Sequence, residues 1–250
     1  MPAVVYSSTN QASLNIATAL KENFSLPSTQ IIETNNSVLE ISCDLQTDYL
    51  IVPSTHKSER KIRTLSVHLP GNWGKAQMGG KDKTLNVAYA SKMKDILVSI
   101  KSQVEDLGLD WQVCLEVDHH GPTCSLPVIF VEIGSTSKEW GDKTAAEICA
   151  KAIVDGIKSQ KEYPTIFGVG GGHYAPLFSK IALESSEAVG HILPKYKVDE
   201  IDYETFLQGI EKCVEKTQYV LIDWKGLDSS QRKKIITFCD NANVPWKAKK

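Results

Sequence analysis

The sequence has no long hydrophobic run. None of its apolar stretches approaches the roughly 18–20 residues that a membrane-spanning helix requires, so we expect no membrane contact. The first residues, MPAVVYSSTN, contain an apolar run of four residues and no basic residue. This pattern is not typical of a signal peptide. It predicts a first β-strand.

Neither sign of charge is in excess. The 250 residues include 28 Lys and Arg against 30 Asp and Glu, a formal net charge of -2. Domains that wrap around nucleic acid are usually strongly basic, so only a local basic patch is left for such a contact. The contents of 42% apolar and 23% charged residues are ordinary for a globular protein. Disorder, collagen-like repeats and coiled coil are therefore excluded for the bulk of the chain.

Cysteine pairs at metal-binding spacing are also missing. The chain has no CxxC pair, and its six cysteines are scattered: Cys43, Cys114, Cys124, Cys149, Cys213 and Cys239. Without an export signal, we expect reduced, mostly buried thiols in a cytoplasmic protein. A chain of this length builds a sufficient core without a disulfide or a metal. A metal-binding pattern here therefore indicates catalysis rather than structure.

Apolar runs with β-propensity alternate with helical patterns. We expect strands at Ala3–Tyr6, Gln30–Ile32, Leu39–Ser42, Tyr49–Val52, Thr64–His68, Gln112–Val117, Pro127–Ile133, Thr165–Val169 and Tyr219–Ile222. We expect helices at Ala12–Glu22, Asn86–Leu107, Thr144–Ser159, Tyr174–Glu184, Glu204–Lys216 and Ser229–Asn241. Interleaved strands and helices predict an α/β fold in a single domain spanning residues 1–250.

Histidine is scarce, and its placement is informative. Each of the six histidines lies at the end of a predicted strand or in the loop that follows it. Such loops line the ligand crevice of open α/β sheets, so these imidazoles meet if the loops converge. His119 and His120 are adjacent, and their side chains point to opposite sides of an extended chain. His68 and His191, taken singly, are as well explained by structural hydrogen bonds.

A glycine-rich turn precedes His173. Gly168, Gly170, Gly171 and Gly172 fall within five positions. The dinucleotide-binding fingerprint fails because His173 stands where its third glycine belongs, and neither a P-loop nor an H-E-x-x-H motif is present. Glycines let the backbone approach a ligand and expose N–H donors. The turn is suited to hold His173 and backbone donors beside an anionic or carbonyl group, with a purely structural turn as the alternative.

Four carboxylates accompany the histidines: Glu59, Glu116, Asp118 and Glu132. Glu132 lies in an otherwise apolar strand, where a carboxylate is costly unless it is paired, hydrogen-bonded or bound to a metal. Imidazoles and carboxylates without thiolate pairs suit a catalytic zinc, which lowers the pKa of bound water to about 7. A spare carboxylate can then act as general base. Without a metal, the same residues could support acid–base hydrolysis.

Two short motifs are specific, His-His-Gly-Pro-Thr at residues 119–123 and Gly-Gly-Gly-His-Tyr-Ala-Pro at residues 170–176. They are accompanied, in order along the chain, by Ser54–Glu59, Leu65–His68, Gly71–Trp73, Gly79–Gly80, Phe130–Ser135, Gly190–Tyr196 and Asp223–Leu227. Together these segments resemble the archaeal and plant type of D-aminoacyl-tRNA deacylase over nearly the whole chain.

The resemblance implies a hydrolase that cuts the ester between a D-amino acid and the terminal ribose of tRNA, and so acts in chiral proofreading. It implies one or two zinc ions as cofactors and the acceptor end of aminoacylated tRNA as partner. It also implies a cytoplasmic monomer without a protein partner. The implied α/β fold has a mixed central sheet flanked by helices, similar to peptidyl-tRNA hydrolase and nucleoside phosphorylases.

A hypothesis for the mechanism follows from the resemblance. The expected zinc ligands are His56, His120, Glu132 and His173, with His119 and His191 as second choices. His119 is also a candidate for a catalytic role. Glu59 or Asp118 is expected to take a proton from the attacking water. N–H groups of the turn at residues 170–172, those of Gly171 and Gly172 above all, are expected to stabilise the oxyanion.

Basic residues cluster beside His56. Lys57, Arg60, Lys61 and Arg63 are expected to contact tRNA phosphates, although such a run is also typical of a solvated loop. Trp73 or Tyr174 is expected to stack on the terminal adenine.

Two other functions stay open. One is a zinc-dependent amidase or peptidase acting on a small substrate, which the basic residues disfavour. The other is a non-catalytic nucleotide- or phosphate-binding module, which does not need clustered histidines and a buried glutamate.

Overall fold

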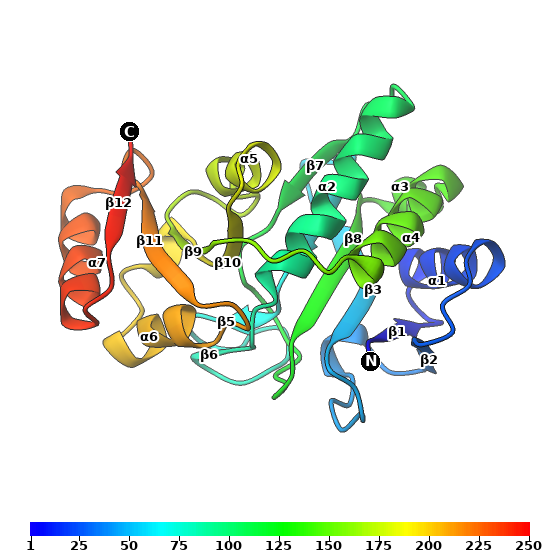
Figure 1. Cartoon of the computed structure of the whole chain (residues 1–250), viewed down its shortest axis with the longest axis horizontal. Helices are drawn as coiled ribbons and strands as arrows, with labels where there is room; N and C mark the ends of the chain where they lie inside the picture. Colours follow the sequence, from blue (N-terminus) through cyan, green and yellow to red (C-terminus); the bar gives the residue numbers. More distant parts are fainter.

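The computed structural model describes all 250 residues and contains two principal β-sheets (Figure 1). The larger sheet has six strands in the order β2-β1-β3-β8-β4-β7. Their bounds are β1 Ala3–Ser7, β2 Gln30–Thr34, β3 Leu50–Lys57, β4 Thr64–His68, β7 Gln112–Leu115 and β8 Val128–Ser135. Neighbouring strands are parallel except β4 and β8, which are antiparallel. The sheet is therefore mixed.

The smaller sheet is wholly parallel, with the order β10-β9-β11-β12. Its strands are β9 Thr165–Val169, β10 Ala188–Leu193, β11 Thr217–Asp223 and β12 Trp246–Lys249. A short hairpin, β5 Gly71–Asn72 with β6 Thr84–Leu85, lies apart from both sheets. The turn η2, Lys195–Lys197, follows β10 directly.

Three helices cover one face of the larger sheet: α1 Gln11–Asn23, α4 Lys143–Lys158 and α2 Ala90–Asp106. Figure 1 shows α2 between the two sheets, where it also packs on β10 and on α5, Pro176–Glu184. A core of 38 buried residues runs from Val131 in the larger sheet to Ile166 and Val189 in the smaller one. The two sheets therefore share one hydrophobic core.

The remaining faces are covered differently. In the smaller sheet, Phe167 and Ile222 pack with α6, Tyr203–Glu211, and α7, Ser229–Asn241. In the larger sheet, Val128 and Phe130 pack against loop residues, among them Val38 of the turn η1, Val38–Glu40. A short helix, α3 Ser137–Trp140, follows β8. Loops over one face leave room there for a site.

The predicted α/β fold with a mixed sheet flanked by helices is confirmed. No helix combines the length and apolar character needed to cross a membrane. Two local predictions are wrong. Leu39–Ser42 is not a strand, because η1 bends the chain there and the Ser37 hydroxyl accepts a hydrogen bond from the Leu39 N–H. Gly190 and His191 lie within strand β10, not in a loop, and the strand accommodates the glycine by a shift in register between Val189 and Ile192.

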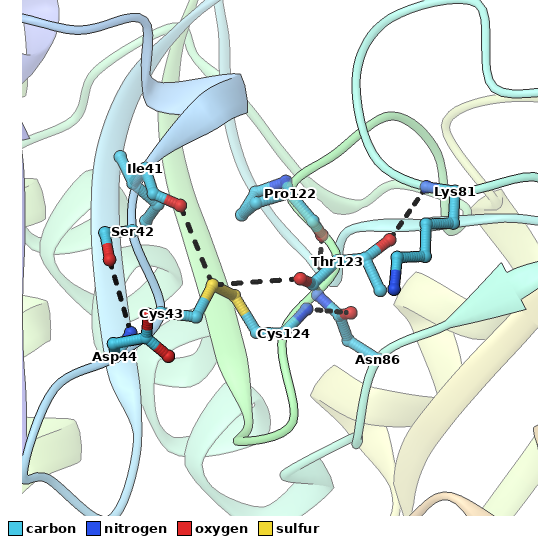
Figure 2. The surroundings of a disulfide bond; sticks show 9 residues. All are labelled: Ile41, Ser42, Cys43, Asp44, Lys81, Asn86, Pro122, Thr123 and Cys124. Carbon is cyan, nitrogen blue, oxygen red and sulfur yellow. Dashed lines mark hydrogen bonds between the residues drawn. A yellow bond between two sulfur atoms is a disulfide. The ribbon is translucent and has the colours of Figure 1, made fainter.

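One disulfide joins two of the loop segments over the larger sheet. Cys43 and Cys124 form the bond, with their Cα atoms 5.5 Å apart, and Figure 2 shows its surroundings. The Asn86 side chain holds the second loop by accepting from the Cys124 N–H and donating to the Pro122 carbonyl, both at 2.9 Å. The expectation of reduced thiols throughout is therefore wrong for this pair. The two cysteines are 81 residues apart in the sequence, so no local spacing motif indicated the bond.

The other four cysteines are free thiols. Cys114, Cys149 and Cys239 are buried, and Cys213 is partly buried. For these four the expectation of reduced, mostly buried thiols holds.

Candidate active site

Most of the histidines meet over the strands β3, β8 and β4 of the larger sheet, on the face covered by loops. Five of the six imidazoles and two carboxylates form a group that we call the His/Glu cluster: His56, His68, Glu116, His119, His120, Glu132 and His173. His56 lies near the end of β3, His68 ends β4, and Glu132 lies on β8 between these two strands. The other four residues follow β7 or β9.

The strand register explains why these side chains share a face. Val131 and Ile133 enter the helix-covered core, so Glu132, which alternates with them, points to the opposite face. His56 pairs with Gly134 in the neighbouring strand. A Cβ atom at position 134 would lie 3.0 Å from the His56 ring, so this glycine leaves the space that the imidazole occupies.

Glu116 lies at the centre of one half of the cluster. Its Oε2 atom is 2.8 Å from His173 Nε2 and 3.6 Å from His119 Nε2, and its Oε1 atom is 3.2 Å from His56 Nδ1. Glu116 is fully buried, and this one carboxylate therefore connects three imidazoles that come from different loops and strands.

The other half of the cluster is built around His68. Its Nε2 atom is 3.1 Å from His120 Nε2, and its Nδ1 atom is 4.0 Å from Glu132 Oε2. The same glutamate oxygen is 3.6 Å from His56 Nδ1. His56 and Glu132 therefore connect the two halves.

Backbone acceptors orient two of the rings. His119 Nδ1 donates to the Val117 carbonyl at 2.8 Å, and His120 Nδ1 donates to the Gly121 carbonyl at 2.5 Å. When Nδ1 carries the proton, the Nε2 lone pair of a neutral imidazole is free. Both Nε2 atoms face the cluster, that of His120 at 3.1 Å from His68 Nε2, and this orientation of the rings is common among metal-ligating histidines.

The electrostatics keep these two rings neutral. Burial, with the neighbouring imidazoles, lowers the pKa of His119 to about 3, and burial lowers the pKa of His120 to about 4. Burial raises the pKa of Glu132 to about 7. Burial also opposes ionisation of Glu116, but the imidazoles of His173 and His56 outweigh it and lower the pKa of that carboxyl. The neutral rings of His119 and His120 are in the protonation state that a metal ion needs in its ligands. Against the effect of burial, the carboxylates of Glu116 and Glu132 raise the pKa of His56 to about 11, so this ring would bind a metal ion only with loss of its proton.

The cluster fits a divalent metal ion. Three sets of ligand atoms lie within 4.8 Å of one another: His68, His119 and His120; His56, Glu116 and His173; His68, Glu116 and Glu132. Three buried atoms of these sets, His68 Nδ1 and both Glu116 oxygens, have no well-aligned hydrogen-bond partner. Buried polar atoms are normally satisfied, so this donor set of nitrogen and oxygen atoms can hold one or two metal ions.

The structure separates Asp118 and His191 from the cluster. His191 is 1% exposed, and its two ring nitrogens bond to Asp118 Oδ2 at 2.5 Å and to the Lys212 carbonyl at 2.7 Å. Asp118 Oδ1 accepts from the Ile192 N–H. Both residues thus fasten β10 to the loop that carries His119, and neither has a free atom for a metal or for a proton from water.

The other predicted residues lie around the cluster. Glu59 is exposed and lines the same hollow as His56 and His173, a space of about 630 Å³. Tyr174 lines it too, and its hydroxyl lies 3.0 Å from His56 Nε2. Trp73 cannot stack on an adenine, because it is 2% exposed and packs face to face on Phe167.

The basic residues divide into two kinds. Lys57, Arg60 and Lys61 are exposed and form no ion pair. Arg63 instead stacks on the Trp111 ring and bonds to Asp142 at 3.2 Å. Only the first three side chains are therefore free to meet a phosphate.

The glycine turn before His173 has unused donors. The Gly170 N–H donates to the Leu193 carbonyl, whereas the N–H groups of Gly171 and Gly172 have no acceptor in the protein. The backbone at Gly171 has φ of 75°, which favours glycine. The His173 carbonyl accepts from the Val117 N–H at 3.0 Å, which fixes this turn to the loop that carries Glu116.

Two cluster residues were not among the residues predicted for the site. The sequence indicates Glu116 only as a carboxylate near the histidines, and His68, taken singly, is as well explained by structural hydrogen bonds. The signal for Glu116 was its position on the polar face of the strand whose other face holds Val113 and Leu115. The signal for His68 was its place at the end of an apolar strand, like His56.

The cluster is reached from more than one side. His119 and His120 line a hollow of about 140 Å³ and a second of about 370 Å³. His56 and His173 also line the second hollow, and both residues line the neighbouring hollow of about 630 Å³ together with Glu59. An extended substrate can therefore pass over the cluster.

Comparison with known proteins decides the family. The sequence pattern described as D-aminoacyl-tRNA deacylase matches residues 43–247. The chain belongs to this family. The D-aminoacyl-tRNA deacylase of Pyrococcus furiosus is 34% identical over 251 residues, which cover 90% of this chain and 92% of the relative. That of Methanosarcina barkeri is 40% identical over 202 residues, which cover 80% of this chain and 65% of the relative.

A solved structure also matches this member of the D-aminoacyl-tRNA deacylase family. The crystal structure of a conserved protein of unknown function superimposes with a TM-score of 0.91 at 28% identity, covering 99% of this chain and 95% of the other. The resemblance predicted from the sequence is thus confirmed, and with it the hydrolase class for which the relatives are named. The matched range includes every residue of the His/Glu cluster.

Proposed function

We propose that this chain hydrolyses the ester bond of D-aminoacyl-tRNA and that the His/Glu cluster is its active site. The observation that carries the proposal is the meeting of five imidazoles and two carboxylates, from separate loops and strands, in a chain of this family. No other group of three or more potential ligands is found in the molecule.

The ligand sets proposed for zinc follow the geometry of the cluster. One set is His68, His119 and His120, and the other is His56, Glu116 and His173. Glu132 lies beside both, whereas His191 belongs to neither. When bound, zinc would polarise the ester carbonyl and make the attacking water more acidic.

The chain's own residues supply the remaining parts of the reaction. The N–H groups of Gly171 and Gly172 have no acceptor and stand next to His173, so we assign them to the oxyanion that develops on the ester carbonyl. Of the two carboxylates predicted as the base, Asp118 is bonded through both oxygens. We therefore assign the proton of the attacking water to Glu59.

The reaction is the hydrolysis of the aminoacyl ester by one water molecule. The water oxygen forms a bond to the ester carbonyl carbon, and the bond between that carbon and the ribose oxygen breaks. The proton that Glu59 accepts from water returns to the ribose oxygen. The products are the free D-amino acid and tRNA with an intact terminal ribose.

The acceptor end of the tRNA would lie along the hollow of about 630 Å³ beside His56. Lys57 and Arg60 line this hollow, and Lys61 follows them on the same loop. These side chains would neutralise phosphates. Action in the cytoplasm, as a monomer and without a protein partner, stays a prediction from the sequence.

The proposal is tested with matched esters. Purified protein is incubated with tRNA carrying D-tyrosine and with tRNA carrying L-tyrosine, and the release of labelled amino acid is followed. We expect the D-ester to be hydrolysed at least about 100-fold faster than the L-ester. Since the two substrates differ only in the configuration of the amino acid, the ratio of their rates measures the chiral preference of the site. Small D-peptides serve as the control. Cleavage of the peptides without cleavage of the tRNA ester would contradict the proposal and support an amidase.

A further inference from the structure

The hollow of about 140 Å³ beside His119 and His120 is not explained by the reaction described above. It is smaller than the roughly 300 Å³ at which sites for drug-sized ligands begin, so it suits a single planar group. Its walls include Met78 and Tyr196, residues that are 57% and 53% exposed. Exposed apolar side chains that gather beside polar groups mark binding surfaces.

Hydrogen bonds of the backbone fix Met78 and Tyr196 to segments next to cluster residues. Tyr196 lies in η2, where the Lys195 N–H donates to the Gly171 carbonyl at 3.0 Å. The Met78 carbonyl accepts from the Gly121 N–H at 2.9 Å, directly after His120 in the chain. The exposed ring and thioether are thus presented from backbone that is tied to the site, so their positions are prepared before a ligand binds.

The chemistry of the walls points to a nucleobase. A tyrosine ring offers a flat apolar face on which a base stacks, and a thioether makes favourable contacts with aromatic rings. At the rim, Lys75 is exposed and forms no ion pair, whereas Lys197 is paired with Glu200 at 2.7 Å. One free cation beside a stacking face suits a nucleotide with a single nearby phosphate.

The other aromatic residues near the cluster are placed differently. Trp73 is buried against Phe167, and Tyr174 lines the separate hollow of about 630 Å³ beside His56. Only Tyr196 combines an exposed ring with a place in a hollow that ends on His119 and His120.

We propose that Tyr196 and Met78 form the surface on which the 3′-terminal adenine of the tRNA stacks while the aminoacyl ester lies against the cluster. This inference rests on the proposed function, because the adenine is the part of the substrate adjacent to the ester. Every aminoacyl-tRNA carries this adenine, whereas the aminoacyl side chain varies. Tyr196 therefore serves binding of all substrates alike.

The first test uses 5′-AMP as the probe and does not depend on activity. AMP is titrated into the full-length wild type, Tyr196→Phe, Tyr196→Ala and, as an exposed aromatic control on β12, Trp246→Ala, with binding followed by NMR chemical shifts. We expect Tyr196→Ala to weaken AMP binding about 10- to 100-fold, while Tyr196→Phe and Trp246→Ala bind like the wild type. Wild type that does not bind AMP, or Tyr196→Ala that binds it equally well, overturns the inference.

The second test separates the adenine from the aminoacyl group. With D-tyrosyl-tRNA and D-alanyl-tRNA, we expect Tyr196→Ala to raise KM about 10- to 100-fold for both substrates and to change kcat little. With D-tyrosine methyl ester, which lacks the adenine, the variant should equal the wild type. A loss that persists on the methyl ester, or that is confined to D-tyrosine, assigns the hollow to the aminoacyl side chain and overturns the inference. Wild type that binds AMP through Tyr196 but leaves D-aminoacyl-tRNA intact refutes the proposed function instead.

Discussion

His173 and His191 show how the hydrogen-bond partners of a residue decide its role. Both histidines follow glycine in short segments that looked alike in the sequence. His173 lies on a loop with one nitrogen 2.8 Å from Glu116, whereas both nitrogens of His191 are bonded within the core. One ring is available for chemistry, and the other is part of the fold.

Substitution should separate these roles. His173→Ala removes a cluster ligand from a partly exposed loop position, and we expect kcat/KM to fall at least about 100-fold with the melting temperature nearly unchanged. His191→Ala leaves the Asp118 carboxylate buried without its partner, and we expect a loss of about 3 kcal/mol in the free energy of unfolding. Kinetics and thermal unfolding of both variants check this. Full activity of His173→Ala would show that His173 has no part in the reaction.

A second prediction for a single residue concerns Glu59. Glu59→Gln keeps the size of the side chain but cannot accept a proton, so we expect kcat to fall about 100-fold with KM unchanged. The fall in kcat is measured under single-turnover conditions with D-aminoacyl-tRNA. Glu40→Gln, a change of the same kind in η1, is the control. Activity of Glu59→Gln within twofold of the control would move the base elsewhere.

The loops between elements carry most of the site, and this limits what the sequence could predict. Four of the seven cluster residues, Glu116, His119, His120 and His173, lie outside any strand or helix. Their placement in loops at strand ends was predictable from the alternation of strands and helices. Their meeting in one place was not predictable, since β4 and β7 run opposite to β3 and β8 and end at the other edge of the sheet. Which ring faces the cluster was not, because it depends on bonds such as that from His119 Nδ1 to the Val117 carbonyl.

The elements themselves were predicted well where periodicity was strong. Helix α2 and strands β8 and β9 lie close to their expected positions. Strand β10 was missed because Gly190 and Pro194 resemble loop residues, and only pairing with β9 makes this segment a strand. The error placed His191 in a loop, and its assignment as a metal ligand followed from that.

The disulfide between Cys43 and Cys124 joins two loop segments, and its effect on stability can be measured. A link across 81 residues restricts the unfolded chain, so we expect Cys43→Ser, Cys124→Ser or reduction with dithiothreitol to lower the free energy of unfolding by about 2–4 kcal/mol. Cys213→Ser, which removes a free thiol, should have little effect. Urea unfolding provides the measurement. Peptide mapping of the unreduced protein that finds both Cys43 and Cys124 as free thiols would contradict the pairing.

At the scale of the whole molecule, a net charge of only -2 conceals a basic rim beside the site. We expect the triple variant Lys57→Ala, Arg60→Ala and Lys61→Ala to raise KM for tRNA and to reduce the slope of log KM against log salt by about 2–3. Lys158→Ala with Lys161→Ala, in a hollow that shares no residue with the site, is the control. An unchanged salt slope in the triple variant would place the tRNA on another surface.

The fold class and the family could be predicted from the sequence because the residues that indicate them are distributed over the whole chain. The exact site could not be predicted, because it combines residues from His56 to His173 that follow or belong to strands of both sheets. A substitution such as Gly134 to alanine would reach this site only by displacing His56. Such dependence on packing is visible in the structure and has no signature in composition or spacing.

Removal of the metal tests whether the His/Glu cluster acts through bound zinc. D-aminoacyl-tRNA hydrolysis is measured on the purified protein, after dialysis against a chelator, and after zinc is returned in steps, with the bound metal quantified each time. We expect the rate to fall at least about 100-fold on removal and to recover in proportion to zinc bound by the cluster. Undiminished hydrolysis by protein that holds no measurable metal would contradict the account.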